Sequence, residues 1–262
     1  GIFDSGVGGL SVLRALRDLP GTERLLYLAD SAHAPYGERD PAHVIERSLR
    51  LTEYLLEQGA GMVVVACNTA TACAIDLLRE RFPDLPLVGV EPGVKPAAQV
   101  SRNRRMAVLA TPATLSSARF ERLVHLHAPE CDVLRIPCPG LAAAIERGVS
   151  AHEEIDALLD RFCAPLQAHP VDTVVLGCTH YPFVADRIAQ RLGPGVHLLD
   201  TAQAVARQVQ RLQQAQAQAP RADGPTAAKP AVELLSTGDC GPLEELARNG
   251  LSLGLRAREV HI

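Results

Sequence analysis

Short apolar runs alternate with longer segments of helical periodicity along the whole chain. The apolar runs are rich in Val, Leu and Ile and are bounded by Gly, Pro, Asp or Ser, which is typical of buried strands. Between them, apolar residues recur at helical spacing, as in the stripe Ile155, Leu158, Leu159 and Phe162. This alternation predicts an α/β protein with largely parallel sheets. The expected strands are Gly1–Phe3, Leu25–Ala29, Met62–Ala66, Leu87–Val90, Met106–Ala110, Val133–Ile136, Thr173–Leu176, Val196–Leu199 and Val232–Ser236, and the expected helices include Leu10–Leu19, Ala42–Gln58, Thr69–Arg81 and Glu153–Ala168.

Two of the expected strands end in nearly the same sequence. Val63–Thr69 and Val174–His180 are each a β-branched run, a small residue, a cysteine and polar residues. We expect each cysteine to lie at the carboxyl end of a strand, just before a helix, where ligands collect in parallel α/β sheets. Two thiols facing one substrate from opposite sides suit the removal of a proton from one face of a carbon and its return to the other.

The matched motifs predict two similar lobes, each a largely parallel sheet flanked by helices, with the active site in the cleft between them. The Pro/Gly-rich run Glu91–Pro96 marks the expected crossing between the lobes. We place one lobe at residues 1–92 plus 203–262, and the other at residues 93–202. The low-complexity segment Gln213–Ala231 predicts a frayed helix end followed by a mobile surface loop.

Composition narrows the function classes. The net charge of −4 gives no electrostatic argument for a nucleic-acid partner or an anionic membrane, and no apolar run approaches the roughly 20 residues of a membrane-spanning helix. Seven cysteines at irregular spacings predict free thiols and a cytoplasmic location. No metal-binding spacing occurs, and neither Lys95 nor Lys229 lies where a Schiff-base lysine is expected. We therefore expect neither a metal nor pyridoxal phosphate.

A glycine-rich turn, Asp4–Gly9, follows the first expected strand. Such a turn lets backbone N–H groups approach an anion, but Ser11 breaks the dinucleotide-binding pattern and no P-loop lysine is present. A tight strand-to-helix turn capped by Asp4 or Ser5 is an equally good interpretation. The loop Asp30–Gly37, which contains Pro35 and Tyr36, is explained by either a shaped binding loop or an ordinary connection.

The seven cysteines fall into two groups. Cys67 and Cys178 end strands, precede polar residues and form a matched pair, so we interpret them as chemically active. A free thiol has a pKa of about 8.5, and a helix N-terminus is expected to lower it. The others are interpreted as small hydrophobes: Cys73, Cys131, Cys138, Cys163 and Cys240. Alone, His180 is equally well explained as a capping or core histidine, and Glu146 as a solvated helix carboxylate.

Five motifs, in this order along the chain, together resemble the glutamate racemase family: Asp4–Leu10, Pro35–Gly37, Ala66–Ala70, Val90–Gly93 and Leu176–Pro182. The resemblance covers essentially the whole chain, and Gly-Cys-Thr-His-Tyr-Pro at residues 177–182 is highly specific. It implies a cofactor-independent, two-base racemisation of glutamate that supplies D-glutamate to peptidoglycan, in an enzyme that can be a homodimer.

The resemblance also implies roles for individual residues. Cys67 matches the thiol that works on D-glutamate, and Cys178 matches the thiol that works on L-glutamate. Asp4 matches the carboxylate beside the first thiol, and Glu146 and His180 match the groups beside the second. Asp30 matches a further acidic position. The residues that match substrate-binding positions are Asp4, Ser5, Pro35, Tyr36, Gly37, Asn68, Thr69, Thr114, Thr179 and His180.

Three alternatives stay open at this point. An aspartate racemase of the same superfamily usually carries Glu where His180 stands. An amino-acid-binding regulator would keep the pocket without turnover. A thiol hydrolase needs only one nucleophile, so it leaves the second matched cysteine without a role.

Overall fold

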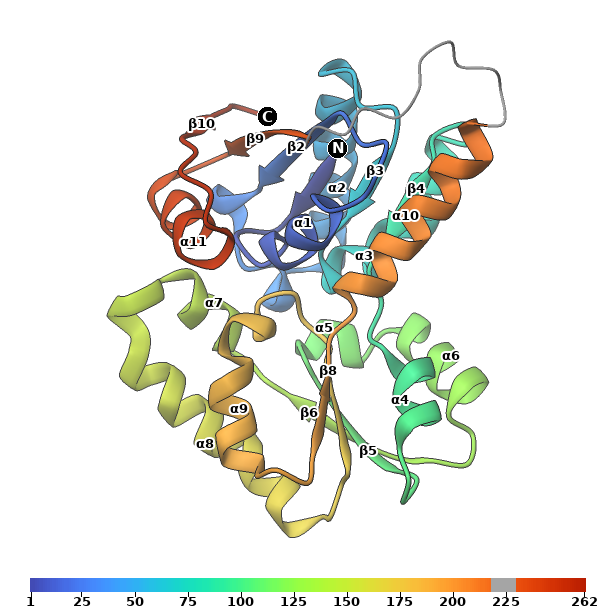
Figure 1. Ribbon diagram of the computed structural model, residues 1–262, viewed down its shortest axis with the longest axis vertical. Coiled ribbons are helices and arrows are strands. Elements are labelled where there is room, and N and C mark those ends of the chain that lie inside the picture. The colour runs from blue at the N-terminus through green and yellow to red at the C-terminus, as the bar shows by residue number, and fades with distance from the viewer. Residues whose placement is uncertain (218–229) are drawn as a thin grey trace.

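The computed structural model describes residues 1–217 and 230–262, and these residues form two lobes stacked one above the other (Figure 1). Each lobe is built on one parallel sheet with helices on both faces, which confirms the predicted α/β class. The sequence segment predicted as a mobile loop lies largely outside the described residues. Its first residues, from Gln213 to Ala217, form the C-terminal end of the helix Ala202–Ala217.

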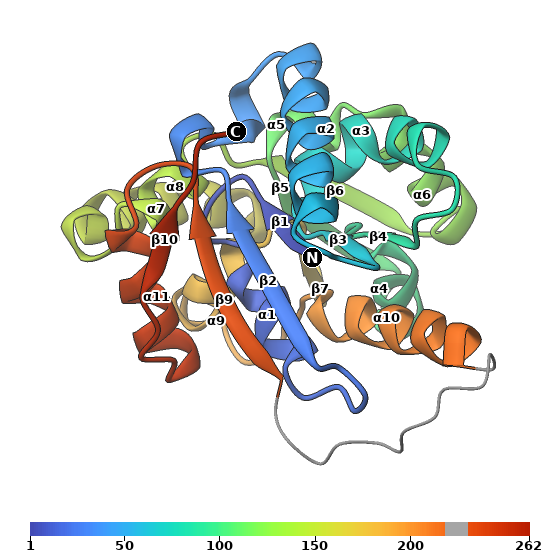
Figure 2. The ribbon, with the colours of Figure 1, turned by 90° about the horizontal axis from the view of Figure 1, so that it is seen from above.

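The first sheet has the strand order β10-β9-β2-β1-β3-β4. Helices α1, α10 and α11 pack on one face, and α2 and α3 pack on the other, as the view from above shows (Figure 2). The elements of this lobe are β1 (Ile2–Asp4), α1 (Leu10–Leu16), β2 (Arg24–Ala29), η1 (Ser31–His33), η2 (Tyr36–Glu38), α2 (Pro41–Glu57), β3 (Val63–Val65), α3 (Asn68–Arg81), β4 (Leu87–Gly89), α10 (Ala202–Ala217), β9 (Ala231–Ser236), α11 (Gly241–Leu251) and β10 (Ala257–Glu259).

The second sheet has the order β6-β5-β7-β8. Helices α7, α8 and α9 cover one face, and α4 and α6 cover the other. The elements of this lobe are α4 (Val94–Val100), β5 (Arg105–Ala110), α5 (Pro112–Leu115), α6 (Ala118–His127), β6 (Asp132–Pro137), α7 (Leu141–Glu146), η3 (Gly148–Ala151), α8 (His152–Ala168), β7 (Thr173–Leu176), η4 (Tyr181–Val184), α9 (Ala185–Leu192) and β8 (His197–Leu199).

The two sheets share one connectivity. In each, the first strand of the lobe lies between the second and the third, and the fourth pairs with the third; β9 and β10 extend the first sheet beyond β2. Cys67 follows β3 and Cys178 follows β7, so both cysteines occupy the end of the third strand of their lobe. The predicted division of the chain near residues 92 and 203 stays a prediction.

Ion pairs join the lobes near the crossing at Glu91–Pro96. Arg119 on α6 of the second lobe donates to Glu91 over 2.5 Å and to Asp76 on α3 of the first lobe over 3.0 Å. These contacts join α6 of the second lobe to α3 and to the crossing segment on this side. Within the described residues no helix is long and apolar enough to cross a bilayer.

Candidate active site

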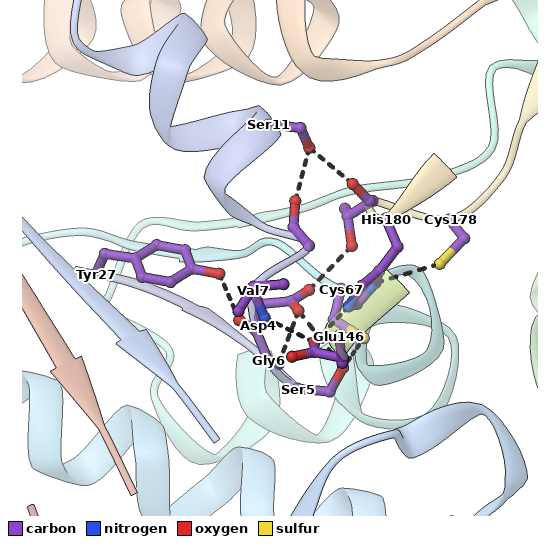
Figure 3. A network of polar contacts seen from close by, with 12 residues as sticks. Asp4, Ser5, Gly6, Val7, Ser11, Tyr27, Cys67, Glu146, Cys178 and His180 are labelled. Atoms are coloured by element: carbon purple, nitrogen blue, oxygen red, sulfur yellow. Dashed lines mark hydrogen bonds and ion pairs between the residues drawn. The ribbon is translucent and has the colours of Figure 1, made fainter. Parts of the chain in front are cut away.

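The carboxyl ends of strands from both sheets meet in one buried polar network (Figure 3). The first sheet contributes residues from the ends of β1 and β3, and the second contributes residues from the end of β7 and from α7. The sequence-predicted residues brought together here are Asp4, Ser5, Cys67, Asn68, Glu146, Cys178, Thr179 and His180.

Cys67 caps the N-terminus of α3. Its sulfur accepts a hydrogen bond from the N–H of Ala70 at 3.5 Å, and its thiol lies 3.8 Å from Oγ of Ser5. The predicted lowering of its pKa is nevertheless wrong: burial raises the pKa of the Cys67 thiol well above its ordinary value, and the negative charge of Asp4 raises it further. The helix N–H opposes these effects but is outweighed because the thiol has lost its water.

Cys178 has a different local structure. The predicted helix does not start at this residue, because a turn and the η4 segment with Pro182 intervene and α9 begins only at Ala185. The sulfur instead contacts Nδ1 of His180 at 3.6 Å. The two matched motifs therefore present their thiols to different partners: a backbone N–H and a hydroxyl for Cys67, an imidazole for Cys178.

His180 links Cys178 to Glu146. Its Nε2 lies 2.5 Å from Oε1 of Glu146, and its side chain is 2% exposed. Burial disfavours the charged imidazole, but the hydrogen bonds to Cys178 and Glu146 and the charges of both together raise the pKa of His180 well above its usual value. A protonated His180 donates from both ring nitrogens, so it can stabilise a thiolate at Cys178 while Glu146 holds its orientation.

Asp4 is fully buried at the end of β1. It accepts hydrogen bonds from the N–H of Gly6 at 2.9 Å and from Oγ1 of Thr179 at 3.0 Å. Burial nevertheless raises the pKa of Asp4 to about 6, partly offset by the positive charge of His180. The carboxyl group therefore changes its charge close to neutral pH.

The glycine turn after β1 holds anions that belong to the protein itself. The N–H of Gly6 binds Asp4, as in the capped turn, and the N–H of Val7 donates to Oε1 of Glu146 at 2.7 Å. The interpretation as a capped turn explains the contact of Gly6 with Asp4. The interpretation as an anion-binding turn explains the contact of Val7 with Glu146, a carboxylate from the other lobe. A side chain at Gly6 would overlap the Glu146 carboxylate.

The two thiols lie close enough to interact electrostatically, since negative charge on Cys178 raises the pKa of Cys67. Asn68, the neighbour of Cys67, lines the same small cavity as Cys178. Its volume of about 10 Å³ is near the space that one water molecule requires. No group in the described residues accepts a hydrogen bond from Nδ2 of buried Asn68, so this amide is available to a ligand.

The remaining predicted residues form a second group. The hydroxyl groups of Thr69 and Thr114 meet at that of Thr111, at 2.9 and 3.0 Å. Gly37 lies against the Thr111 side chain. The hydroxyl of Tyr36 donates a hydrogen bond to Asp30, which leaves the backbone of Tyr36 as the part that can contact a ligand. Pro35 precedes Tyr36 in the same loop.

Sequence reasoning missed four contributors to this region. Thr111 follows β5, so its position at the end of another parallel strand was the available signal. Ser11 donates to the carbonyl of Thr179 at 3.1 Å across the lobes, and Tyr27 donates to the carbonyl of Gly6 at 2.6 Å. The N–H of Val7 carried no sequence signal at all, because any residue supplies one.

A second cavity, much larger than the one beside Cys178, lies behind Glu146. Its volume is about 450 Å³, and it is bordered by α7 and α11, which face one another in Figure 1. Glu146 separates this cavity from His180. Neither cysteine nor Asp4 lines the large cavity, whereas Cys178 lines the small one together with Asn68 and Thr179.

Comparison with known proteins gives one family. The model of the Asp/Glu/hydantoin racemase family matches residues 10–209. A glutamate racemase of Pseudomonas aeruginosa is 51% identical over 217 residues, covering 83% of this chain and 82% of the relative. A glutamate racemase of Ralstonia pickettii is 46% identical over 262 residues, covering 100% of this chain and 91% of the relative.

Solved structures agree. The crystal structure of glutamate racemase isoform RacE1 from Bacillus anthracis has a TM-score of 0.88 at 29% identity and covers 100% of this chain and 97% of its own. An Escherichia coli glutamate racemase, solved with L-glutamate and the activator UDP-MurNAc-Ala, has a TM-score of 0.83 at 31% identity and covers 98% of this chain and 96% of its own.

Proposed function

Because this chain belongs to the Asp/Glu/hydantoin racemase family, we propose that it interconverts L- and D-glutamate by a two-base mechanism in which Cys67 and Cys178 exchange protons with the α-carbon and no cofactor takes part. The D-glutamate supplies peptidoglycan. The curated relatives are glutamate racemases, which favours glutamate over aspartate. One observation carries the mechanism: the two thiols rise from separate sheets into the same buried network.

In the L-to-D direction, Cys178 acts as the base. The α-C–H bond breaks, the proton passes to Sγ of Cys178, and the electron pair stays on the α-carbon. The S–H bond of Cys67 then breaks, and its proton forms a new C–H bond on the opposite face. The contacts fit this direction, since burial keeps Cys67 protonated and the imidazole of His180 lies beside the sulfur of Cys178.

Each turnover leaves the two thiols with exchanged protonation states. The site must therefore return a proton from Cys178 to solvent and supply one to Cys67 before the next L-glutamate reacts. His180 and Glu146 connect Cys178 to the side of the site that faces the large cavity, and Ser5 connects Cys67 to Asp4. These two chains of hydrogen bonds are the proposed routes for that exchange.

The carbanion needs stabilisation, because an amino-acid α-proton is a very weak acid and a thiolate is a modest base. The unpartnered amide of Asn68 and the hydroxyl groups of Ser5 and Thr179 are the donors placed nearest the thiols. Donors aimed at the α-carboxylate stabilise developing charge most strongly where water is excluded. The small cavity between the lobes supports such exclusion.

The test is racemisation in deuterated water by purified protein with a chelator and without pyridoxal phosphate. With L-glutamate, early D-glutamate should carry deuterium at the α-carbon while recovered L-glutamate stays largely protiated, because different thiols remove and deliver the proton. Product that retained its original α-hydrogen would exclude two bases. Activity that disappeared with the chelator and returned with a metal would exclude the cofactor-independent mechanism.

We propose a homodimer in the cytoplasm, on the basis of the resemblance and the free thiols.

The amino-acid-binding regulator is the second candidate: glutamate binding without exchange of the α-proton would establish it and would refute the racemase. Rates on glutamate and aspartate, measured side by side, decide the substrate.

A further inference from the structure

A buried ion pair lies at the base of the loop that carries Tyr36 and Gly37. Arg47 on α2 forms a two-pronged contact with Asp30: Nε donates to Oδ2 at 2.9 Å and Nη2 donates to Oδ1 at 2.8 Å. The side chains are 5% and 0% exposed. Among the Arg–carboxylate pairs of the described residues, this is the one with both partners buried. Because burying such charges costs solvation energy, the position of the pair calls for an explanation other than stability.

Asp30 and Arg47 together bind several segments that are far apart in the sequence. Asp30 accepts hydrogen bonds from the hydroxyl of Tyr36 and, at 2.8 Å, from that of Thr237 after β9. Arg47 also donates to the carbonyl of Ile262 at 2.9 Å. Every oxygen of the carboxylate and every arm of the guanidinium thus has a partner, and the tyrosine is one of them.

The loop held in this way contacts the other lobe. Gly37 packs against the side chain of Thr111, where a Cβ would come within 2.6 Å of Cγ2. The next residue, Glu38, accepts a hydrogen bond from the N–H of Gly140 at 2.9 Å. Thr111 in turn bonds the hydroxyl of Thr69. A shift of the Tyr36 ring would therefore move the loop at the point where the lobes and the proposed substrate positions meet.

Resting on the proposed function, we propose that Arg47 is a positioning residue for substrate binding: by fixing Asp30, and through it Tyr36, it holds the Tyr36–Glu38 segment against the second lobe. Arg47 makes none of the contacts of the thiol network, so it affects how tightly glutamate is held and not how fast the proton moves. Its loss should raise KM and leave kcat nearly unchanged.

Three variants separate this role from a purely structural one. Arg47→Met leaves a charged Asp30 buried without a partner, so both stability and KM should suffer. The double variant Asp30→Asn/Arg47→Met removes both charges, so the melting temperature should recover. KM should stay raised about tenfold, the effect of losing one or two hydrogen bonds, with kcat within about threefold of the wild type. Arg47→Lys keeps the charge but loses the planar two-pronged contact.

The control is Arg50→Met on the same helix. Arg50 pairs with Glu46, with side chains 53% and 58% exposed, so the same charge is removed from a solvated site and KM should not change. A double variant with recovered melting temperature and wild-type KM would overturn the inference. If the double variant does not fold, Arg47→Lys decides: raised KM at unchanged kcat supports positioning, and wild-type KM refutes it. Absence of racemisation in the wild type itself would refute the proposed function instead.

Discussion

Replacement of Asp4 by Asn should make the protein progressively more stable, relative to the wild type, as the pH rises. Burial raises the pKa of Asp4 from 3.8 to about 6, so the folded state holds a proton that the unfolded state has released. A group whose pKa is raised on folding contributes stability below its unfolded pKa and loses it as the pH rises through the folded pKa. Stability from Asp4 is therefore lost between about pH 4 and pH 6.

The size of the effect follows from the same shift. At 1.36 kcal/mol for each pKa unit, the full loss is about 3 kcal/mol. Between about pH 4.5 and about pH 7.5, where denaturation is practical, about 2 kcal/mol of it should be observable. Asn cannot ionise, so the variant lacks this loss. It also loses hydrogen bonds of the carboxylate to Gly6 and Thr179, but that offset is largely independent of pH.

The assay is urea denaturation of both proteins at several pH values, without substrate. The quantity to plot is the difference between their free energies of unfolding, which should move in favour of Asp4→Asn by about 2 kcal/mol across this range. Ser11→Ala is the control, because it removes buried hydrogen bonds of the same interface but no ionisable group, so its difference should stay constant. A constant or decreasing difference for Asp4→Asn would refute the assignment of a buried, easily protonated carboxyl.

Further predictions concern activity. Cys67→Ser and Cys178→Ser should each reduce racemisation by a factor on the order of 10²–10⁴ or more, measured as D-glutamate formed, while Cys163→Ser and Cys240→Ser should not; a motif variant with near-normal turnover would contradict the two-thiol assignment. Glu146→Gln removes a contact that raises the pKa of His180, so with D-glutamate the alkaline limb of the kcat/KM profile should move to lower pH, and an unmoved limb would exclude this pairing. Gly6→Ala should displace Glu146 and shift the same limb in the same direction; wild-type kinetics would show that the carboxylate has room to move.

The sequence predicted the strands that are buried on both faces of their sheet, because such strands are continuous apolar runs. All nine expected strands are present with ends that differ by a residue or so, because runs such as Val63–Val65 lie in sheet interiors. Strand β10 was missed: Ala257–Glu259 is a short edge strand with one apolar residue, so it has no period to detect. The similarity of the two lobes was predicted from the repeated cysteine motif alone.

Properties set by distant residues could not be predicted in this way. The direction of the Cys67 pKa shift depends on how much water the closed lobes exclude, and local sequence shows only the helix that opposes the shift. Arg47 has the sequence context of an ordinary helix residue, and only the fold shows that Asp30 and Ile262 surround it. Cys178 was assigned the wrong local structure because Pro182, acceptable in the first turn of a helix, here belongs to a separate short turn.

The burial of both thiols, with only a one-water cavity beside Cys178, has a consequence for how they are exposed to reactive chemicals. Cys67 and Cys178 are 5% and 7% exposed, and the space of about 10 Å³ beside Cys178 is too small for glutamate. We therefore expect glutamate to reach the thiols only when the lobes separate and the contacts from Thr179 to Asp4 and from Val7 to Glu146 are broken. The same contacts hold the carboxyl groups of Asp4 and Glu146 in place near the thiols. We expect peroxide and alkylating agents to reach the thiols only during this opening, when the groups that surround them in the closed form have moved apart. The thiols are thus expected to react with the substrate only in the closed form, and to be open to chemical modification only in the open form.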